Sequence, residues 1–298
     1  MASNNPAFSN PAFQDRSSAR PFAGSGTAPA APQATDAATT ARLEGMYAAP
    51  PAGAIETGRM TVEDTVIKTL ALFAVLVVAA VGGWIWTMAP VTAANPQPTM
   101  VPWIVGAIGG LVLALVVIFG SRTKVRPALI FAYAAFEGLF VGSISAFFEY
   151  IWPGIVFQAT LATLAVVGVT LALFASGKVR ASRRATKIWL IAMIGYGVFS
   201  LLNVVLMLFG AFPAGSGGAF GLLSDVHILG IPLGLIIGVF VVILAAYSLV
   251  LDFDSIQQGV RNGAPRQYGW LGGFGIMVTV VWLYLEILRI LAIARGSN

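Results

Sequence analysis

The sequence predicts an all-α membrane protein, with seven transmembrane helices preceded by a disordered N-terminal tail. Two features of the composition support this fold class: hydrophobic residues make up 58% of the 298 residues, and charged residues only 10%. A typical soluble domain carries about 25% charged residues. A third feature is the order of the chain, in which long apolar segments alternate with short loops.

The composition also excludes several classes of function. The chain has no Cys, so disulfides, thiolate catalysis and Cys-ligated metals are excluded, and its single His cannot form a His-based metal cluster. Hydrolase and phosphate-loop motifs such as HExxH and GxSxG are missing from the sequence. We therefore expect no enzymatic activity and no cofactor. The net charge of +5 is attributed to loops that orient the protein in the membrane, not to binding of nucleic acid.

Residues 1–59 are predicted to form a disordered cytoplasmic tail, and residues 60–298 the transmembrane domain. The tail is rich in Ala, Pro, Ser, Asn, Thr and Gly, and it has too few large apolar residues to offset the entropy of ordering. Its tetrapeptide Asn5–Phe8 recurs as Asn10–Phe13. The repeat is interpreted either as a short docking motif or as low-complexity drift. No apolar signal-peptide core precedes residue 60, so we expect the first span to act as its own insertion signal.

The first span is introduced by a helix-capping pattern. Thr61 is the expected N-cap, and Glu63 and Asp64 place acids in the first helical turn. A span needs about 20 mainly apolar residues. The seven expected spans are residues 66–88, 101–119, 127–148, 154–175, 188–212, 227–251 and 268–294.

The basic residues of the loops predict the orientation of the helices. Lys and Arg occur at 122–126, 178–187 and 261–266, whereas loops 89–100, 149–153 and 211–226 contain neither. By the positive-inside rule, the first set of loops is cytoplasmic. We therefore expect a multi-pass protein of the plasma membrane, with its N-terminus in the cytoplasm and its C-terminus outside.

Small residues four apart indicate close approach of helices. We expect tight packing inside one bundle, with dimerisation as the less favoured alternative. The glycines concerned are Gly106 with Gly110, Gly138 with Gly142, Gly230 with Gly234 and Gly238, and Gly269 with Gly273.

Two acidic residues follow the sixth span. Asp252 and Asp254 are expected at the inner membrane interface, where acids at a helix C-terminus oppose the helix dipole. Two carboxylates this close cannot both ionise without cost. They are candidate proton or ion ligands and could hold calcium. The alternative is that both are solvated loop residues, with Asp254 paired to Arg261.

Three further charges lie inside predicted spans, where an ionisable residue is a functional-site candidate by default. Glu137 lies roughly 15 Å from the start of the third span, near mid-bilayer, and must be protonated, paired across helices or facing a wet cavity. Glu286 and Arg289 are three residues apart in the last span, so they can neutralise one another. We expect them toward the outer side, as a structural ion pair or as an outer gate.

The C-terminal segment resembles a known family. The run LVLDFDSIQQGVRNGAPRQYGWLGGFGIMVTVVWLYLEILRILA is similar to the C-terminal signature of the Bax inhibitor-1/YccA (TMBIM) family, bacterial branch. MTVEDTVIKT at Met60 and FEGLFVGSIS at Phe136 resemble that branch as well. The likeness spans residues 60–295 and leaves the tail outside.

The resemblance implies a seven-helix bundle with a central last helix, acting as a pH-sensitive calcium leak. It also implies a pair of aspartates, one near the end of the sixth helix and one on the seventh. The first matches Asp254, or Asp252 if the register shifts. The second has no counterpart, because its place falls near Thr279. Glu137 could supply the missing carboxylate, or Asp252 and Asp254 could act alone.

These observations lead to two hypotheses. In the first, the protein is a cation leak, with calcium favoured because hard cations prefer carboxylate and carbonyl oxygens. Asp252 and Asp254 would then bind the proton or ion, Glu137 would line the path, and Glu286 with Arg289 would close the outer half. In the second, it is a non-conducting scaffold in the lipid bilayer that regulates other membrane proteins, such as proteases, through its tail or loops.

Overall fold

The fold is described from a computed structural model. It describes residues 58–122, 124–209 and 222–296. The tail predicted at 1–59, with its Asn-Pro-Ala-Phe repeat, lies almost wholly outside the described residues. Its disorder therefore remains a prediction.

Seven long helices within the described residues confirm the predicted fold class, and all are long and apolar enough to cross a membrane. A short helix, α7 (Leu222–Asp225), and a two-stranded hairpin, β1 (His227–Ile228) with β2 (Ile231–Pro232), precede the sixth long helix. The long helices are α2 (Val62–Met88), α3 (Val101–Gly120), α4 (Pro127–Ile151), α5 (Ile155–Ala175), α6 (Arg183–Leu208), α8 (Leu233–Arg261) and α9 (Tyr268–Gly296).

Local sequence signals explain where these helices begin. Thr61 caps α2 as predicted, because its hydroxyl oxygen accepts the Asp64 backbone N–H at 3.1 Å. Ser182 caps α6 in the same way through Ala185, at 3.2 Å. This cap starts α6 five residues before the predicted span. Pro127 occupies the first turn of α4, where its missing N–H costs nothing.

The sixth span differs most from its prediction. Residues 227–232, expected to be helical, form the hairpin, whose turn holds Leu229 and Gly230 at φ 54° and 82°. Helix α8 then continues to Arg261, ten residues beyond the predicted end at 251. The apolar run ends at residue 251, but the first helix-terminating signal comes later, at Asn262 and Gly263. Gly263 has φ 65°. Asp252 and Asp254 are therefore helical residues, not residues of an interfacial loop.

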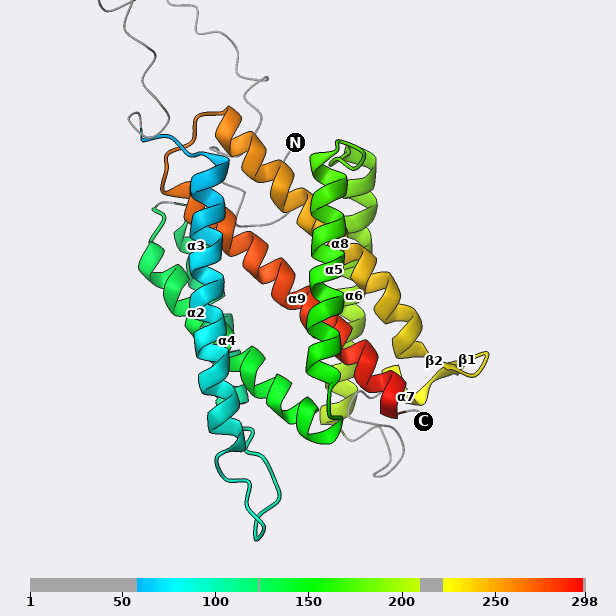
Figure 1. Ribbon diagram of the computed structural model, residues 1–298. Helices are drawn as coiled ribbons and strands as arrows, with labels where there is room; N and C mark the ends of the chain where they lie inside the picture. The colour runs from blue at the N-terminus through cyan, green and yellow to red at the C-terminus, as the bar shows by residue number, and fades with distance from the viewer. Residues whose placement is uncertain (1–57, 123, 210–221, 297–298) are drawn as a thin grey trace, which may run out of the picture.

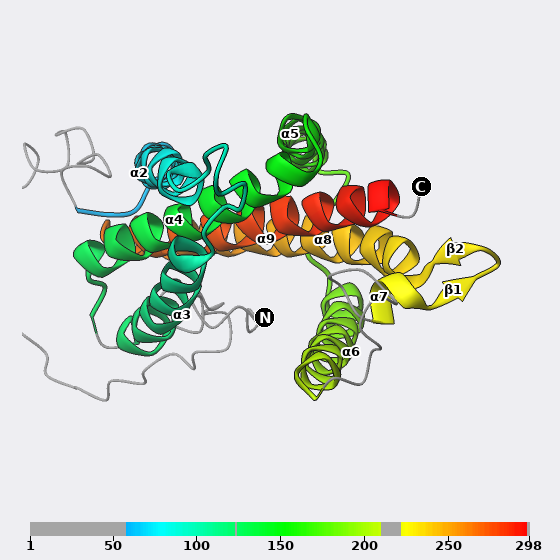
Figure 2. The ribbon, with the colours of Figure 1, turned by 90° about the horizontal axis from the view of Figure 1, so that it is seen from below.

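The helices form a central layer covered on both faces. Figure 2 shows α4, α9 and α8 side by side, with α2 and α5 on one face and α3 and α6 on the other. Helix α9 crosses the molecule diagonally in Figure 1 and packs against α2, α4, α5 and α8. This arrangement confirms the expectation that the last helix is central.

Glycines bring α2 and α4 into direct backbone contact. A Cβ atom on Gly142 would lie 1.9 Å from the Ala80 carbonyl oxygen, and one on Gly138 would lie 2.2 Å from that of Leu76. Most of the predicted glycine positions likewise lie at helix contacts, as in soluble and membrane bundles with small interface residues. Gly230 is the exception, because it belongs to the hairpin turn.

Candidate functional site

The contact between α8 and α9 contains a buried carboxyl group. Asp252 of α8 is 1% exposed, and the Thr279 hydroxyl of α9 donates a hydrogen bond to its Oδ2 at 2.6 Å. Thr279 is itself 4% exposed. The position at which the resembled family would carry its second aspartate is thus occupied by a hydroxyl that binds Asp252. Of the two possible registers, the structure brings Asp252, not Asp254, to this position.

Asp254 lies on a different side of the same helix. Residues two apart on a helix do not face each other, so the continuation of α8 separates the two carboxyl groups. Asp254 is half-buried and accepts a hydrogen bond from Gln258 Nε2 at 3.0 Å. Arg261, the alternative partner considered from the sequence, donates to Gln257 Oε1 at 3.0 Å. The two carboxyl groups thus lie on different sides of one helix and not in a solvated loop, which was the alternative considered from the sequence.

Small polar residues flank Asp252 on its own face of α8. Ser248 lies one turn before it and Ser255 one turn after it, and they are 9% and 5% exposed. Toward the start of α2, apolar residues close the bundle, including Met60, Ile256 and Leu271, none more than 5% exposed. Asp252 therefore lies within a short polar strip that apolar packing separates from the end of the bundle.

Glu137 faces α3, not α9. It lines a hollow of about 250 Å³ between α3 and α4, together with Tyr133 and Gly110. The Tyr133 hydroxyl is its hydrogen-bond partner, and a Cβ atom on Gly110 would lie 3.0 Å from its Oε2. The side chain occupies room that the glycine leaves. The structure thus brings Thr279, and not Glu137, to Asp252.

Glu286 and Arg289 form the ion pair expected from their spacing on α9. Both also contact Tyr196 of α6: its hydroxyl donates to Glu286 Oε1, and Arg289 Nη1 donates to the Tyr196 oxygen at 2.8 Å. Trp282 Nε1 donates to Glu286 at 3.3 Å. Glu286 is 5% exposed, so the group is an enclosed polar cluster. Whether the pair acts as a gate stays a prediction.

The depth of this cluster differs from the expectation. Tyr196 lies halfway along α6, which runs from Arg183 to Leu208, so the cluster joins α6 to α9 near mid-span and not at the outer interface. The tilt of α9 across the bundle accounts for the difference, because counting residues along a tilted helix overestimates depth (Figure 1). Glu149, at the end of α4, caps α5 by accepting hydrogen bonds from the backbone N–H groups of Gly154 and Val156, at 2.5 and 3.0 Å.

A second ionic cluster was not anticipated from the sequence. Asp64 accepts hydrogen bonds from Lys68 at 2.5 Å and from Arg266 at 2.7 Å. Lys68, 7% exposed, also donates to the Arg266 carbonyl at 2.6 Å. The hydrogen bond to Asp64 raises the pKa of the Arg266 guanidinium. The spacing of Asp64 and Lys68, four residues apart, was an available signal, but Arg266 is distant in sequence.

The same region is joined by main-chain hydrogen bonds. Met60 N–H donates to the Ala264 carbonyl at 2.7 Å, and Arg266 N–H donates to that of Gly58 at 2.8 Å. These bonds clasp the residues before α2 to the turn that leads into α9. In Figure 1 this clasp and the α5–α6 turn lie at the same end of the bundle, which gathers the basic loops there.

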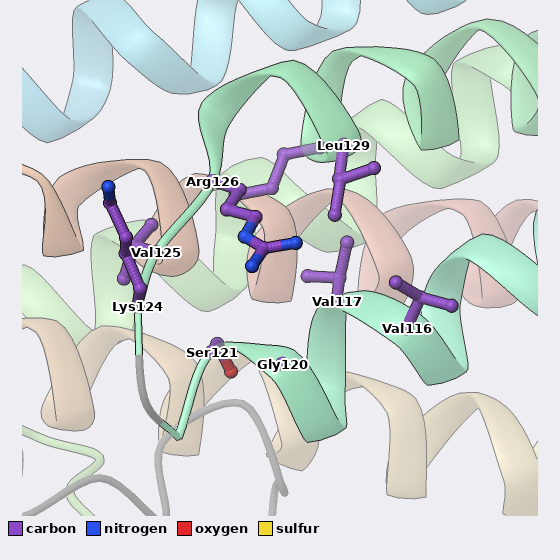
Figure 3. A pocket seen from close by; sticks show the side chains of 9 residues that line it. Val116, Val117, Gly120, Ser121, Lys124, Val125, Arg126 and Leu129 are labelled. Atoms are coloured by element: carbon purple, nitrogen blue, oxygen red, sulfur yellow. The ribbon is translucent and has the colours of Figure 1, made fainter.

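A metal centre built from several side chains is not assembled. Across residues 58–122, 124–209 and 222–296, no three His, Asp or Glu side chains are grouped to hold an ion. The basic turn between α3 and α4 has only a small hollow of about 30 Å³, lined by Val117, Ser121 and Arg126 among others (Figure 3). That is room for about one water molecule.

Comparison with known proteins decides the family. The family model described as Bax inhibitor 1 like matches residues 5–296. This chain belongs to the Bax inhibitor 1 like family. No curated protein and no solved structure matched the chain.

The extent of the match corrects one expectation. The resemblance was based on residues 60–295, with the tail outside it, whereas the Bax inhibitor 1 like model begins at residue 5. The N-terminal segment is therefore part of the family pattern. The match also covers α8 and α9 and the contact between Asp252 and Thr279 that they form.

Proposed function

We propose that this Bax inhibitor 1 like protein is a pH-sensitive cation leak, with calcium as the favoured ion, and that Asp252 is the group that exchanges protons and cations. The observation that carries the proposal is a carboxyl group 1% exposed between the two long C-terminal helices, bound by a hydroxyl from the central helix. Intramembrane carboxyl groups are costly and mark ion or proton pathways.

The chemistry of the contact supplies a switch. A protonated carboxyl group is compatible with dry surroundings, whereas a carboxylate accepts hydrogen bonds only and needs several donors or a cation. Asp252 is 1% exposed in this contact, so its surroundings suit the first form better than the second. Deprotonation of Asp252 therefore favours separation of α8 from α9 and entry of water or a cation. On this account the leak increases as pH rises.

The other charged groups take separate places in the proposal. Asp254, half-buried and two residues nearer the end of α8 than Asp252, would receive the ion at the mouth of the path. The Glu286–Arg289 pair, held by Tyr196, would close the other half. Glu137 contacts α3 and α4 residues, so we leave it outside this path. Its substitution then serves as a control.

The orientation follows from the loops. The basic turns after α3, α5 and α8 would be cytoplasmic by the positive-inside rule. The protein would then span the plasma membrane with Met60 near the cytoplasm and the end of α9 outside. In this orientation the apolar closure near Met60 would lie between Asp252 and the cytoplasm.

Calcium flux into proteoliposomes tests the proposal. The parent protein, Asp252→Asn and Glu137→Gln would be compared at several pH values between about 6 and 8, the range in which a shifted carboxyl group can titrate. We expect pH-dependent flux in the parent and in Glu137→Gln, and pH-independent flux in Asp252→Asn. Equal pH dependence in all three would refute the role of Asp252.

One observation favours a second function, that of a non-conducting scaffold for other membrane proteins. Helix α6 exposes a row of large apolar side chains, including Ile191 at 62% and Leu201 at 64%, and it lies at the edge of the bundle (Figure 2). Such a face suits contact with a partner helix. If purified protein conducts no more calcium than protein-free vesicles at any pH, the scaffold function is the better account.

A further inference from the structure

A large hollow between the described helices lies away from all of the charged clusters. It has a volume of about 490 Å³ and is walled by α2, α4, α5 and α9. Along α2 it extends from Phe73 to Ile85, about 18 Å at 1.5 Å per residue. On α5 it begins at Val156, one residue after the helix starts. It therefore occupies the end of the bundle where α2 finishes and α5 begins.

The hydroxyl groups of this groove are already hydrogen-bonded. The hydroxyl groups of Ser145 and Tyr284 are hydrogen-bonded to each other across α4 and α9 at 2.7 Å. Thr160 and Thr163 each donate to a carbonyl of their own helix at 2.8 Å. A cavity whose polar groups need no partner does not retain ordered water. The groove is therefore a site for an apolar occupant.

The rim of the groove shows where such an occupant comes from. Val81 and Ile85 of α2 and Leu164 of α5 are 56%, 64% and 62% exposed. Figure 2 shows α2 and α5 on the same face of the central layer with α4 and α9 beneath them. In a protein that spans a bilayer, an apolar rim of this kind faces hydrocarbon, since exposed polar backbone is not tolerated there.

We propose that this groove binds one acyl chain of a membrane phospholipid. The groove volume of about 490 Å³ equals roughly sixteen volumes of ~30 Å³, and a methylene group occupies a volume close to this. Its 18 Å length is somewhat over half of the ~30 Å hydrocarbon thickness, which fits a chain from one leaflet. The acyl chain replaces direct packing between α2 and α5, and it touches the central helix at Val281 and Tyr284. The assignment does not depend on whether the protein conducts ions.

The floor of the groove offers a specific test, because bulk lipid does not reach it. Ser145, Thr163 and Val281 line the groove yet are only 4%, 4% and 5% exposed. The full-length protein would be reconstituted in vesicles of phosphatidylcholine and phosphatidylglycerol containing a diazirine-labelled acyl chain. After photolysis, mass spectrometry of peptides would locate the adducts. We expect adducts on these floor residues in addition to the rim.

Two matched tryptophan substitutions on α5 separate the groove from the surrounding lipid. Thr160→Trp fills the groove from its rim, whereas Leu161→Trp places a tryptophan at a 52% exposed position outside the lining. Labelling of the floor should fall by about tenfold in Thr160→Trp, a factor equivalent to about 1.4 kcal/mol of binding. It should be unchanged in Leu161→Trp.

Other results would overturn the assignment. A floor that is never labelled in the parent protein, while the rim is labelled, means that no acyl chain enters. Floor labelling that persists unchanged in Thr160→Trp means that the label reaches these residues by another route. By contrast, retention of one phospholipid per chain after transfer to dilute detergent, lost only in Thr160→Trp, would independently support binding of an acyl chain in the groove.

Discussion

Replacing Thr279 with valine tests the contact between α8 and α9 with the smallest possible change. Valine keeps the branched shape of threonine and removes the hydroxyl group that donates to Asp252 at 2.6 Å. Asp252 is 1% exposed, so bulk water cannot replace the lost donor without movement of the helices. The substitution therefore removes one partner of a buried acceptor while leaving the packing volume nearly constant.

The expected magnitude follows from that burial. Removing a hydrogen-bond partner from a buried acceptor costs about 1–3 kcal/mol. We expect Thr279→Val to lower the free energy of unfolding by about this amount. Thr163→Val is the matched control, because Thr163 is equally buried, at 4% exposed. Its hydroxyl donates only to a carbonyl of its own helix, so its loss should cost less than about 0.5 kcal/mol.

Denaturant unfolding in mixed micelles, followed by tryptophan fluorescence, would measure both variants. Adding Asp252→Asn to Thr279→Val completes a double-mutant cycle, in which residues in contact show a coupling energy of about 0.5–3 kcal/mol. Equal stability of Thr279→Val and Thr163→Val, or a coupling energy near zero, would show that the contact does not hold α8 against α9.

Three further predictions concern other parts of the bundle. Gly142→Ala should destabilise the protein by about 1–3 kcal/mol, because the added Cβ would lie 1.9 Å from the Ala80 carbonyl oxygen. Gly168→Ala is the control: its Cβ would meet nothing within 4 Å, so thermal unfolding should show a neutral or stabilising effect. Arg289→Met should lower the free energy of unfolding by about 3–5 kcal/mol, because it removes the cation paired with buried Glu286. Most of this loss should be recovered when Glu286→Gln is added, and no recovery would contradict the ion-pair assignment. Asp64→Asn removes the acceptor that Lys68 and Arg266 share, so hydrogen exchange at the Met60 and Arg266 N–H groups should become faster, and unchanged exchange would show that the clasp does not need the ionic cluster.

Much of the architecture can be predicted from the sequence because the bilayer imposes it. Apolar runs of the required length define seven helices, and Thr61 marks the start of the first by side-chain capping. The end of α8 could not be placed, because an apolar run records where a helix leaves the hydrocarbon and not where it stops. Asn262 and Gly263 carry the terminating signal, and reading them would have placed Asp252 and Asp254 on one helix.

The candidate site was only partly accessible to sequence reasoning for a similar reason. Spacing along one helix correctly paired Glu286 with Arg289, but Tyr196, which contacts both, is distant in sequence and carries no charge. The hydrogen bond between Asp252 and Thr279 likewise depends on the register of two packed helices. That register is determined by side-chain packing across the contact, which hydropathy does not record.

The central claim, that the surroundings of Asp252 become hydrated when the protein conducts, can be measured directly because the chain contains no Cys. Ser255→Cys places a single thiol one turn from Asp252, at a position 5% exposed. Gln267→Cys, in the exposed turn before α9, corrects for the effect of pH on thiol reactivity. Relative to this control, a water-soluble thiol reagent should modify Ser255→Cys rapidly at about pH 8, where flux is expected, and slowly at about pH 6. Calcium flux without any modification of the Ser255→Cys thiol would contradict the claim.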